Sequence, residues 1–180
     1  LAAKITGRKL VIHEQNAVPG FTNKLLSKIA NLVFEAFPNT FPDSDKVLYT
    51  GNPLRSEIAE LAEKPRQYEK SSRSLRILVL GGSQGALAIN EVVPELIADW
   101  PEQNRPHVLH QSGERTLEET QVLYKDRGLS SVEGVEVVPF ISNMADAYGW
   151  ADLVICRSGA STVSEIAAVG LPSILIPYPH

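Results

Sequence analysis

The sequence is poor in cysteine, in positive charge and in long apolar runs, and each shortage excludes a class of protein. A single cysteine, Cys156, excludes an internal disulfide framework and is typical of a reducing compartment. The formal net charge of −4 excludes a broad basic field, so we expect no nucleic-acid partner. No apolar run is as long as a membrane span and no segment resembles a signal peptide, so we expect no spanning helix.

What the chain does contain is an ordinary globular composition. Hydrophobic residues make up 43% and charged residues 21%, a balance that argues against disorder. The 180 residues are enough for one domain, or for one domain and part of another. The sequence has no initiator Met, and both of its ends interrupt a helix or strand pattern. We therefore expect it to be a piece of a longer protein.

The larger part of the chain alternates apolar runs with helical patterns. The predicted strands are Leu75–Leu80, His107–Gln111, Val135–Pro139, Asp152–Cys156 and Ser173–Ile176. The predicted helices are about Ala86–Asp99, Glu114–Arg127, Asn143–Tyr148 and Thr162–Val169. Continuous apolar strands joined by helices predict an α/β fold, a Rossmann-like doubly wound parallel sheet covered on both faces.

An earlier, shorter region has the same character. It contains predicted strands at Lys9–His13, Leu32–Phe37 and Lys46–Thr50, with a helical pattern between the first two. The stretch "GNPLR" that follows has the turn chemistry of a hinge. We predict a partial domain over residues 1–53 and a second domain over residues 54–180.

The glycine-rich stretch "LGGSQG" ends the first long strand and precedes a helix. Gly81 and Gly82 allow a sharp turn, and the helix that follows would direct unpaired N–H groups at the same spot. This arrangement is typical of a phosphate site, although a tight turn without a ligand has the same sequence. The spacing is neither G-x-G-x-x-G nor a Walker loop, and no carboxylate follows the next strand. These departures disfavour an NAD-dependent oxidoreductase.

A second polar turn, in "CRSGASTVSEIAAVG", follows a later strand. Thr162 and Glu165 have the spacing of a capping box, in which the carboxylate would bind the start of its own helix. The same carboxylate is equally suited to accept two hydrogen bonds from a ribose diol. Sequence alone leaves both readings of Glu165 open. Cys156, just before this turn, is typical of a small buried hydrophobic residue rather than a nucleophile.

A third polar cluster, "HEQNAVPG" from His13 to Gly20, ends an early strand. It is not a zinc-binding H-E-x-x-H motif because residue 17 is Ala. Side chains at the carboxyl end of a strand are where an α/β protein places ligand contacts. We therefore expect some of these residues to lie at a binding site.

Five stretches taken together resemble the MurG family of peptidoglycan N-acetylglucosaminyltransferases. They are "HEQNAVPGFTNKLL", "GNPLR", "LGGSQGALAIN", "HQSGE" and "VVPFISNMADAYGWADLVICRSGASTVSEIAAVGLP". The resemblance implies a GT-B glycosyltransferase, with two Rossmann-like domains and the active site between them. It implies inverting transfer of N-acetylglucosamine from UDP-N-acetylglucosamine to lipid I, giving lipid II for the cell wall and thereby serving cell shape and division. It further implies no metal or other cofactor, and peripheral attachment to the cytoplasmic face of the inner membrane.

The resemblance also assigns residues to the donor, position by position. The matched donor-site residues are Asn16, Arg55, Ser83, Ile141, Ala160, Ser161, Thr162, Val163, Ser164 and Glu165. Among them, Ser83 would lie near the diphosphate, the backbone of Ile141 would bind uracil, and Glu165 would bind the ribose diol. Asn16 and Arg55 would contact the donor at the cleft and the hinge.

The resemblance assigns fewer residues of this chain to the acceptor side and to the catalytic base than to the donor site. His13 and Glu14 would line the acceptor side, and they are the candidates for the base in this chain. The family's glycine-rich loop would precede Leu1, and a further sugar-binding segment would follow His180. We therefore expect this chain alone to bind UDP weakly at most and to have no turnover. The alternatives are another GT-B transferase of UDP-sugars, a non-catalytic nucleotide-sugar binding module and, less favoured, the oxidoreductase.

Overall fold

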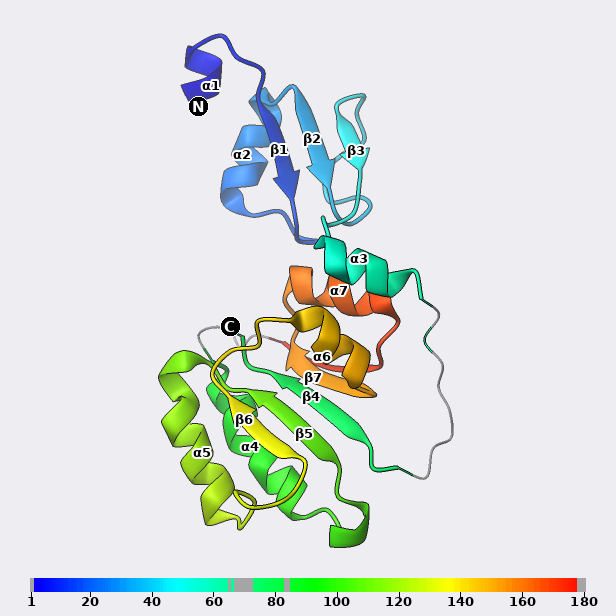
Figure 1. Cartoon of the computed structure of the whole chain (residues 1–180). Helices are drawn as coiled ribbons and strands as arrows, with labels where there is room; N and C mark the ends of the chain where they lie inside the picture. The colour runs from blue at the N-terminus through cyan, green and yellow to red at the C-terminus, as the bar shows by residue number, and fades with distance from the viewer. Residues whose placement is uncertain (1, 65, 67–72, 83–84, 178–180) are drawn as a thin grey trace. The chain divides into compact units, whose positions relative to one another are not determined.

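The structure is a computed structural model that describes residues 2–64, 66, 73–82 and 85–177. The chain divides into two compact units, Leu1–Leu54 and Arg55–His180, which we call unit 1 and unit 2 (Figure 1). The predicted phosphate contact Ser83 lies outside the described residues.

Unit 1 is a small parallel sheet with helices. Its strands are β1 (Val11–Glu14), β2 (Leu32–Glu35) and β3 (Val47–Tyr49), paired in that order. Helix α1 (Ala2–Ile5) precedes β1, and helix α2 (Phe21–Ile29) connects β1 to β2. The buried core consists of Ile12, Ala30, Val33 and Phe41. Parallel neighbours need a crossover connection, which α2 supplies between β1 and β2.

Unit 2 contains a five-stranded parallel sheet. Its strands are β4 (Arg76–Leu80), β5 (His107–Gln111), β6 (Val135–Val138), β7 (Leu153–Arg157) and β8 (Ser173–Ile176). Its α-helices are α3 (Ser56–Ala62), α4 (Leu87–Ala98), α5 (Leu117–Asp126), α6 (Met144–Trp150) and α7 (Ala160–Val169), with 3-10 turns η1 (Glu102–Asn104) and η2 (Glu114–Thr116). The predicted Rossmann-like doubly wound sheet is confirmed, and the element bounds differ from the prediction by a few residues at their ends.

Helices cover both faces of this sheet because its strands are apolar on both sides. In β4, Ile77 and Val79 pack with α4 and α5, whereas Leu78 and Leu80 pack with α3, α6 and α7. Successive side chains of a strand point to opposite faces, so one run of five residues supplies two cores. Figure 1 shows α4 and α5 on one side of the sheet.

The strand order creates a switch point beside β4. The order is β6-β5-β4-β7-β8, so the chain builds outward from β4 to β6 and then returns to the other side of β4. At the carboxyl ends, Leu80 of β4 pairs with Cys156 of β7. Connections diverge from such a point, and ligands of doubly wound sheets bind there.

The start of α7 differs from the capping-box prediction. The helix begins at Ala160, its N-cap is the extended residue Gly159, and no side chain caps it. Thr162 is therefore already inside the helix, because Ala160 and Ser161 both adopt helical geometry ahead of it. The capping-box reading of Glu165 is wrong.

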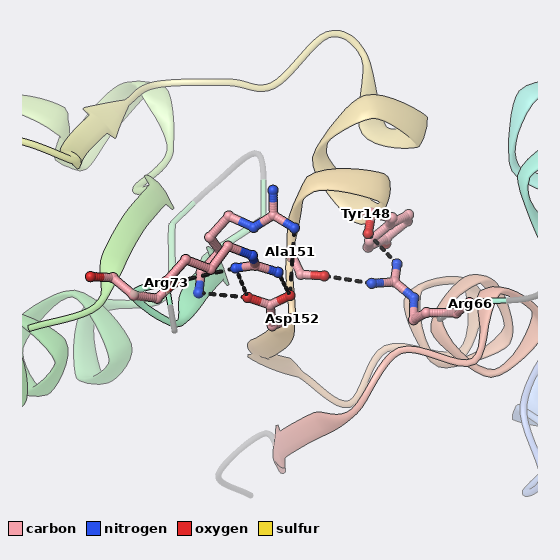
Figure 2. A network of polar contacts seen from close by, with 7 residues as sticks. Arg66, Arg73, Tyr148, Ala151 and Asp152 are labelled. Carbon is pink, nitrogen blue, oxygen red and sulfur yellow. Dashed lines mark hydrogen bonds and ion pairs between the residues drawn. The ribbon is translucent and has the colours of Figure 1, made fainter. Parts of the chain in front are cut away.

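Two arginines that lie between α3 and β4, Arg66 and Arg73, contact the end of α6 and the residues after it (Figure 2). Arg66 donates to the carbonyl oxygens of Tyr148 and Ala151, the latter at 2.5 Å, and thereby satisfies the C-terminal end of α6. Asp152 accepts both Nη groups of Arg73 at 2.6 Å and the amide of Arg76 at 2.9 Å. The Arg73 guanidinium holds the pKa of Asp152 well below its usual range. Helix α3 itself packs on α6 and α7 through its buried residue Ile58.

Candidate functional site

A pocket of about 320 Å³ lies at the switch point of unit 2. Its lining comes from the ends of β4, β5 and β7, from the loop after β6, and from α6, α7 and the start of α3. The lining residues are Arg55, Leu80, Gly81, Gly82, Gln111, Phe140, Ile141, Met144, Tyr148, Cys156, Arg157, Gly159, Thr162 and Glu165. Of the predicted donor residues, the pocket therefore brings together Arg55, Ile141, Thr162 and Glu165.

The backbone supplies the donors on one side of this pocket. Gly82 has φ +77°, a conformation that favours glycine, and a Cβ on Gly81 would lie 3.0 Å from the Gln111 carbonyl oxygen. At the neighbouring strand end, helix α7 starts at the pocket without a side-chain cap. The amides of its first turn have no intrahelical acceptor, and the helix dipole makes this end positive. The geometry suits an anion at the start of α7.

Glu165 lines the pocket from α7 itself, and its carboxylate accepts hydrogen bonds from two other residues. Oε1 accepts Arg55 Nε at 3.1 Å and Nη2 at 3.0 Å, and Oε2 accepts the hydroxyl of Tyr148 at 3.0 Å. The side chain of Glu165 is 13% exposed, whereas that of Arg55 is 51% exposed. The carboxylate therefore lines the pocket in a fixed orientation, with its charge balanced by a partly exposed arginine.

The loop after β6 is fixed by a side chain that the sequence interpretation did not single out. The amide of Ile141 donates to Oε1 of Gln111 at 3.0 Å, and Gln111 is buried at the end of β5. Because Oε1 of Gln111 accepts this bond, the other end of its side-chain amide, Nε2, is the end that can donate. Recognition of a base by the backbone of Ile141 stays a prediction. In this structure the amide of Ile141 already donates to Gln111.

The remaining predicted residues of unit 2 lie on the first turns of α7. Ser164 Oγ donates to the carbonyl oxygen of Ala160 at 2.9 Å, so this hydroxyl is used within the helix. Ser161 is exposed, and Val163 is half-buried. The side chains of Ser161, Val163 and Ser164 are not among those that line the pocket, so any contact of these three residues with a sugar nucleotide would come from their backbone.

In unit 1, Glu14 holds its own loop together. Its carboxylate accepts the amide and side-chain nitrogen of Asn16, both at 3.0 Å, the amide of Gly20 at 3.1 Å and Nδ2 of Asn23 at 2.9 Å. Burial by itself would raise the pKa of Glu14, but these N–H donors together hold that pKa below its ordinary value. The geometry gives Glu14 a structural role, and its catalytic role stays a prediction.

The neighbouring His13 is also engaged within unit 1. Its Nε2 lies 3.0 Å from the carbonyl oxygen of Gly51, and its side chain is half-buried. The bond joins the end of β1 to the turn of "GNPLR". Like the donor contact of Asn16, the acceptor role of His13 stays a prediction.

Tyr148 and Gln111 are two polar pocket residues that the sequence interpretation did not assign to the site. Both stand in stretches that carried the family resemblance, but their own positions looked structural. Gln111 could have been found, because it is a polar residue at the carboxyl end of a predicted strand. Tyr148 gave no such signal, because an aromatic residue on a helix is ordinarily core.

Cys156 is buried, as the sequence predicted. It is 1% exposed, and burial raises the pKa of its thiol to about 11. A thiol with a raised pKa is a poor nucleophile, so the packing role stands.

The described part of the chain offers neither a metal-binding cluster nor a membrane-spanning helix. No group of three or more His, Cys, Asp or Glu side chains is placed to hold a metal ion there. Likewise, none of the helices in residues 2–64, 73–82 and 85–177 combines the length and apolar character needed to cross a bilayer. The expectation of a metal-independent site stays a prediction.

The fold and the pocket together define a class of protein. A doubly wound sheet with glycines, an uncapped helix start and a carboxylate at its switch point is a Rossmann-like ligand-binding domain. The chain belongs to glycosyltransferase family 28, since the model of that family's C-terminal domain matches residues 76–180.

Named relatives and solved structures agree with this family. The transferase named UDP-N-acetylglucosamine–N-acetylmuramyl-(pentapeptide) pyrophosphoryl-undecaprenol N-acetylglucosamine transferase from Ectopseudomonas mendocina is 53% identical over all 180 residues, which span 49% of that relative. Its namesake in Pseudomonas syringae is 52% identical over the same length. The crystal structure of Acinetobacter baumannii MurG has a TM-score of 0.76 and 44% identity, covering 99% of this chain and 48% of that one. The chain thus spans about half the length of the relatives it matches.

A more distant structure shows a likeness of fold alone. The glycotransferase of kitacinnamycin has a TM-score of 0.54 at 18% identity, with 90% of this chain and 40% of that one covered.

Proposed function

We propose that this chain carries the donor-binding part of a transferase that moves N-acetylglucosamine from UDP-N-acetylglucosamine to lipid I, forming lipid II. The observation that carries the proposal is the 53% identity over the whole chain to a relative named for that reaction. The donor would bind in the pocket of unit 2. The reaction would take place at the cytoplasmic face of the membrane, where the lipid acceptor is anchored.

The pocket provides a complementary group for each part of a uridine nucleotide. The pyrophosphate would lie at the start of α7 and beside Gly82, where backbone amides and the helix dipole favour negative charge. The carboxylate of Glu165 would accept hydrogen bonds from the ribose diol. The uracil would lie against the loop that contains Ile141, which Gln111 holds in place.

These groups also suit the bond-breaking step. The acceptor hydroxyl oxygen would attack the anomeric carbon of the sugar, and the bond to UDP would break with its electron pair moving to the diphosphate. Preorganised N–H donors stabilise such developing charge, and one donor contributes about 3 kcal/mol, roughly a hundredfold in rate. His13 and Glu14 remain the candidates in this chain for taking the proton.

Binding can be tested by titrating the isotope-labelled chain with UDP and NADH and following its amide signals by NMR. We expect UDP to shift the signals of Gly82, Ile141 and Thr162, and NADH to leave them unchanged. Glu165→Gln keeps an oxygen for Tyr148 but cannot accept from both ribose hydroxyls, so UDP affinity should fall about tenfold. Glu119→Gln, at an exposed position of α5, is the matched control and should bind UDP normally. Tighter binding of NADH than of UDP would refute the donor assignment.

Transfer itself needs a second experiment, because the chain spans half of its relatives. Fused to the flanking segments of the Ectopseudomonas mendocina relative, the chain should convert lipid I and UDP-N-acetylglucosamine to lipid II. A fusion that binds UDP but transfers no sugar would favour the non-catalytic binding module instead.

A further inference from the structure

Most of the hydrogen-bond acceptor sites on the carboxylate of Glu165 are already occupied by other side chains. A carboxylate has about four lone-pair sites, two on each oxygen. Arg55 uses both sites of Oε1 through Nε and Nη2, and the Tyr148 hydroxyl uses one site of Oε2. A ribose diol needs two acceptor sites, so one existing partner must give way when the diol binds.

The two partners differ in how readily they can move. The side chain of Arg55 is 51% exposed, so its guanidinium can exchange protein contacts for water. Tyr148 is 1% exposed and belongs to the core formed by α3, α6 and α7 with the sheet. A fully buried ring cannot swing away without opening that core.

Tyr148 is also fixed through its backbone. Its carbonyl oxygen accepts a hydrogen bond from Arg66, which reaches α6 from the segment after α3 (Figure 2). The side chain of Tyr148 therefore projects from a helix, α6, whose C-terminal end is held by hydrogen bonds from Arg66. Burial, and next the charge of Glu165, raise the pKa of Tyr148, so its hydroxyl remains a donor.

We propose that Tyr148 is a positioning residue that holds Oε2 of Glu165 toward the ribose while Arg55 releases Oε1 to it. The inference rests on the proposed function, because it assumes that the ligand is a ribonucleotide. Tyr148 makes no contact with the ligand in this arrangement. It acts by keeping the carboxylate in one rotamer, which removes the cost of ordering that side chain on binding.

The test is the preference for UDP over 2′-deoxy-UDP, measured by NMR titration of the 180-residue chain. The wild type should bind UDP about tenfold more tightly, the typical effect of a hydrogen bond to a charged group. Tyr148→Phe keeps the ring but removes the donor, so most of that preference should disappear. Tyr124→Phe removes another buried hydroxyl, 3.0 Å from His110, and should retain the full preference.

A double variant separates positioning from a general loss of packing. Because Tyr148 acts through Glu165, Tyr148→Phe should have no further effect on UDP affinity in the Glu165→Gln background. Additive losses would overturn the inference, as would a full preference for UDP in Tyr148→Phe. A wild type that binds both nucleotides equally would overturn the ribose contact of the proposed function as well.

Discussion

His110 is a polar residue whose role is set by what surrounds it. It is fully buried on β5, where Nδ1 lies 3.0 Å from the Tyr124 hydroxyl and Nε2 lies 3.1 Å from Oδ1 of Asn90. Asn90 in turn donates to the carbonyl oxygen of Ser112 at 3.0 Å. A buried polar chain of this kind is stable only while each member keeps its partner. Burial lowers the pKa of His110 to about 4.

The depressed pKa of His110 predicts a pH dependence of stability. In the unfolded chain the imidazole takes a proton below about pH 6.5, while the folded protein resists it down to about pH 4. The free energy of unfolding should therefore fall as the pH is lowered through this window, by about 1.4 kcal/mol per pH unit at its steepest. Urea titrations at several pH values measure the slope. His110→Gln should reduce it, and His107→Gln, at an exposed position, should not.

At the scale of elements, the turn between β4 and α4 depends on close packing against the next strand connection. Gly85 has φ +82°, and its amide donates to the carbonyl oxygen of Gly82 at 3.2 Å. A Cβ at Gly85 would lie 2.4 Å from Oγ1 of Thr116 and 2.7 Å from the carbonyl oxygen of Ser112. Glycine is needed here both for its backbone conformation and for the space.

Gly85→Ala should therefore destabilise the protein by about 2 to 4 kcal/mol, since strain at a positive φ adds to a steric clash. Gly128→Ala is the matched control. Its φ is +71° but a Cβ there would meet nothing within 4 Å, so we expect a loss of only about 1 kcal/mol. Chemical denaturation of both variants measures the difference. Equal losses would mean that the packing around Gly85 yields easily.

At the scale of the whole molecule, the two units have cores of very different size. Among the described residues, the core of unit 1 has four buried hydrophobic residues, while the two cores of unit 2 have eleven and ten. Small cores support little independent stability, because the buried area has to offset the conformational entropy of the chain. Unit 1 is therefore expected to be the weaker of the two.

This difference predicts that unit 1 unfolds at a lower urea concentration than unit 2. Both tryptophans of the chain, Trp100 and Trp150, belong to unit 2, so their fluorescence reports that unit alone. Circular dichroism should show an earlier phase that fluorescence lacks. Val33→Ala, at a fully buried position of unit 1, should move the earlier phase only. A single transition shared by both probes would contradict independent unfolding.

Local sequence patterns were enough to predict the strands of unit 2 and the family. Apolar runs predicted every strand of unit 2 to within a few residues, because a parallel strand buried on both faces has to be apolar along its length. The glycine turn before α4 was equally readable, since its backbone geometry restricts the residue type.

The tertiary structure excluded the capping-box interpretation of Glu165 and placed its carboxylate in the pocket, whereas the ribose contact stays a prediction. Arg55 and Glu165 are separated by 110 positions, and Tyr148 lies on a different helix from Glu165. These side chains meet because the strand order places β7 beside β4 and because α3 packs on α6 and α7. The spacing of residues along the chain does not reveal such long-range contacts. The same local sequence is therefore compatible with a capping box and with a carboxylate that lines a pocket. The same reason explains why Tyr148 could not be identified in advance.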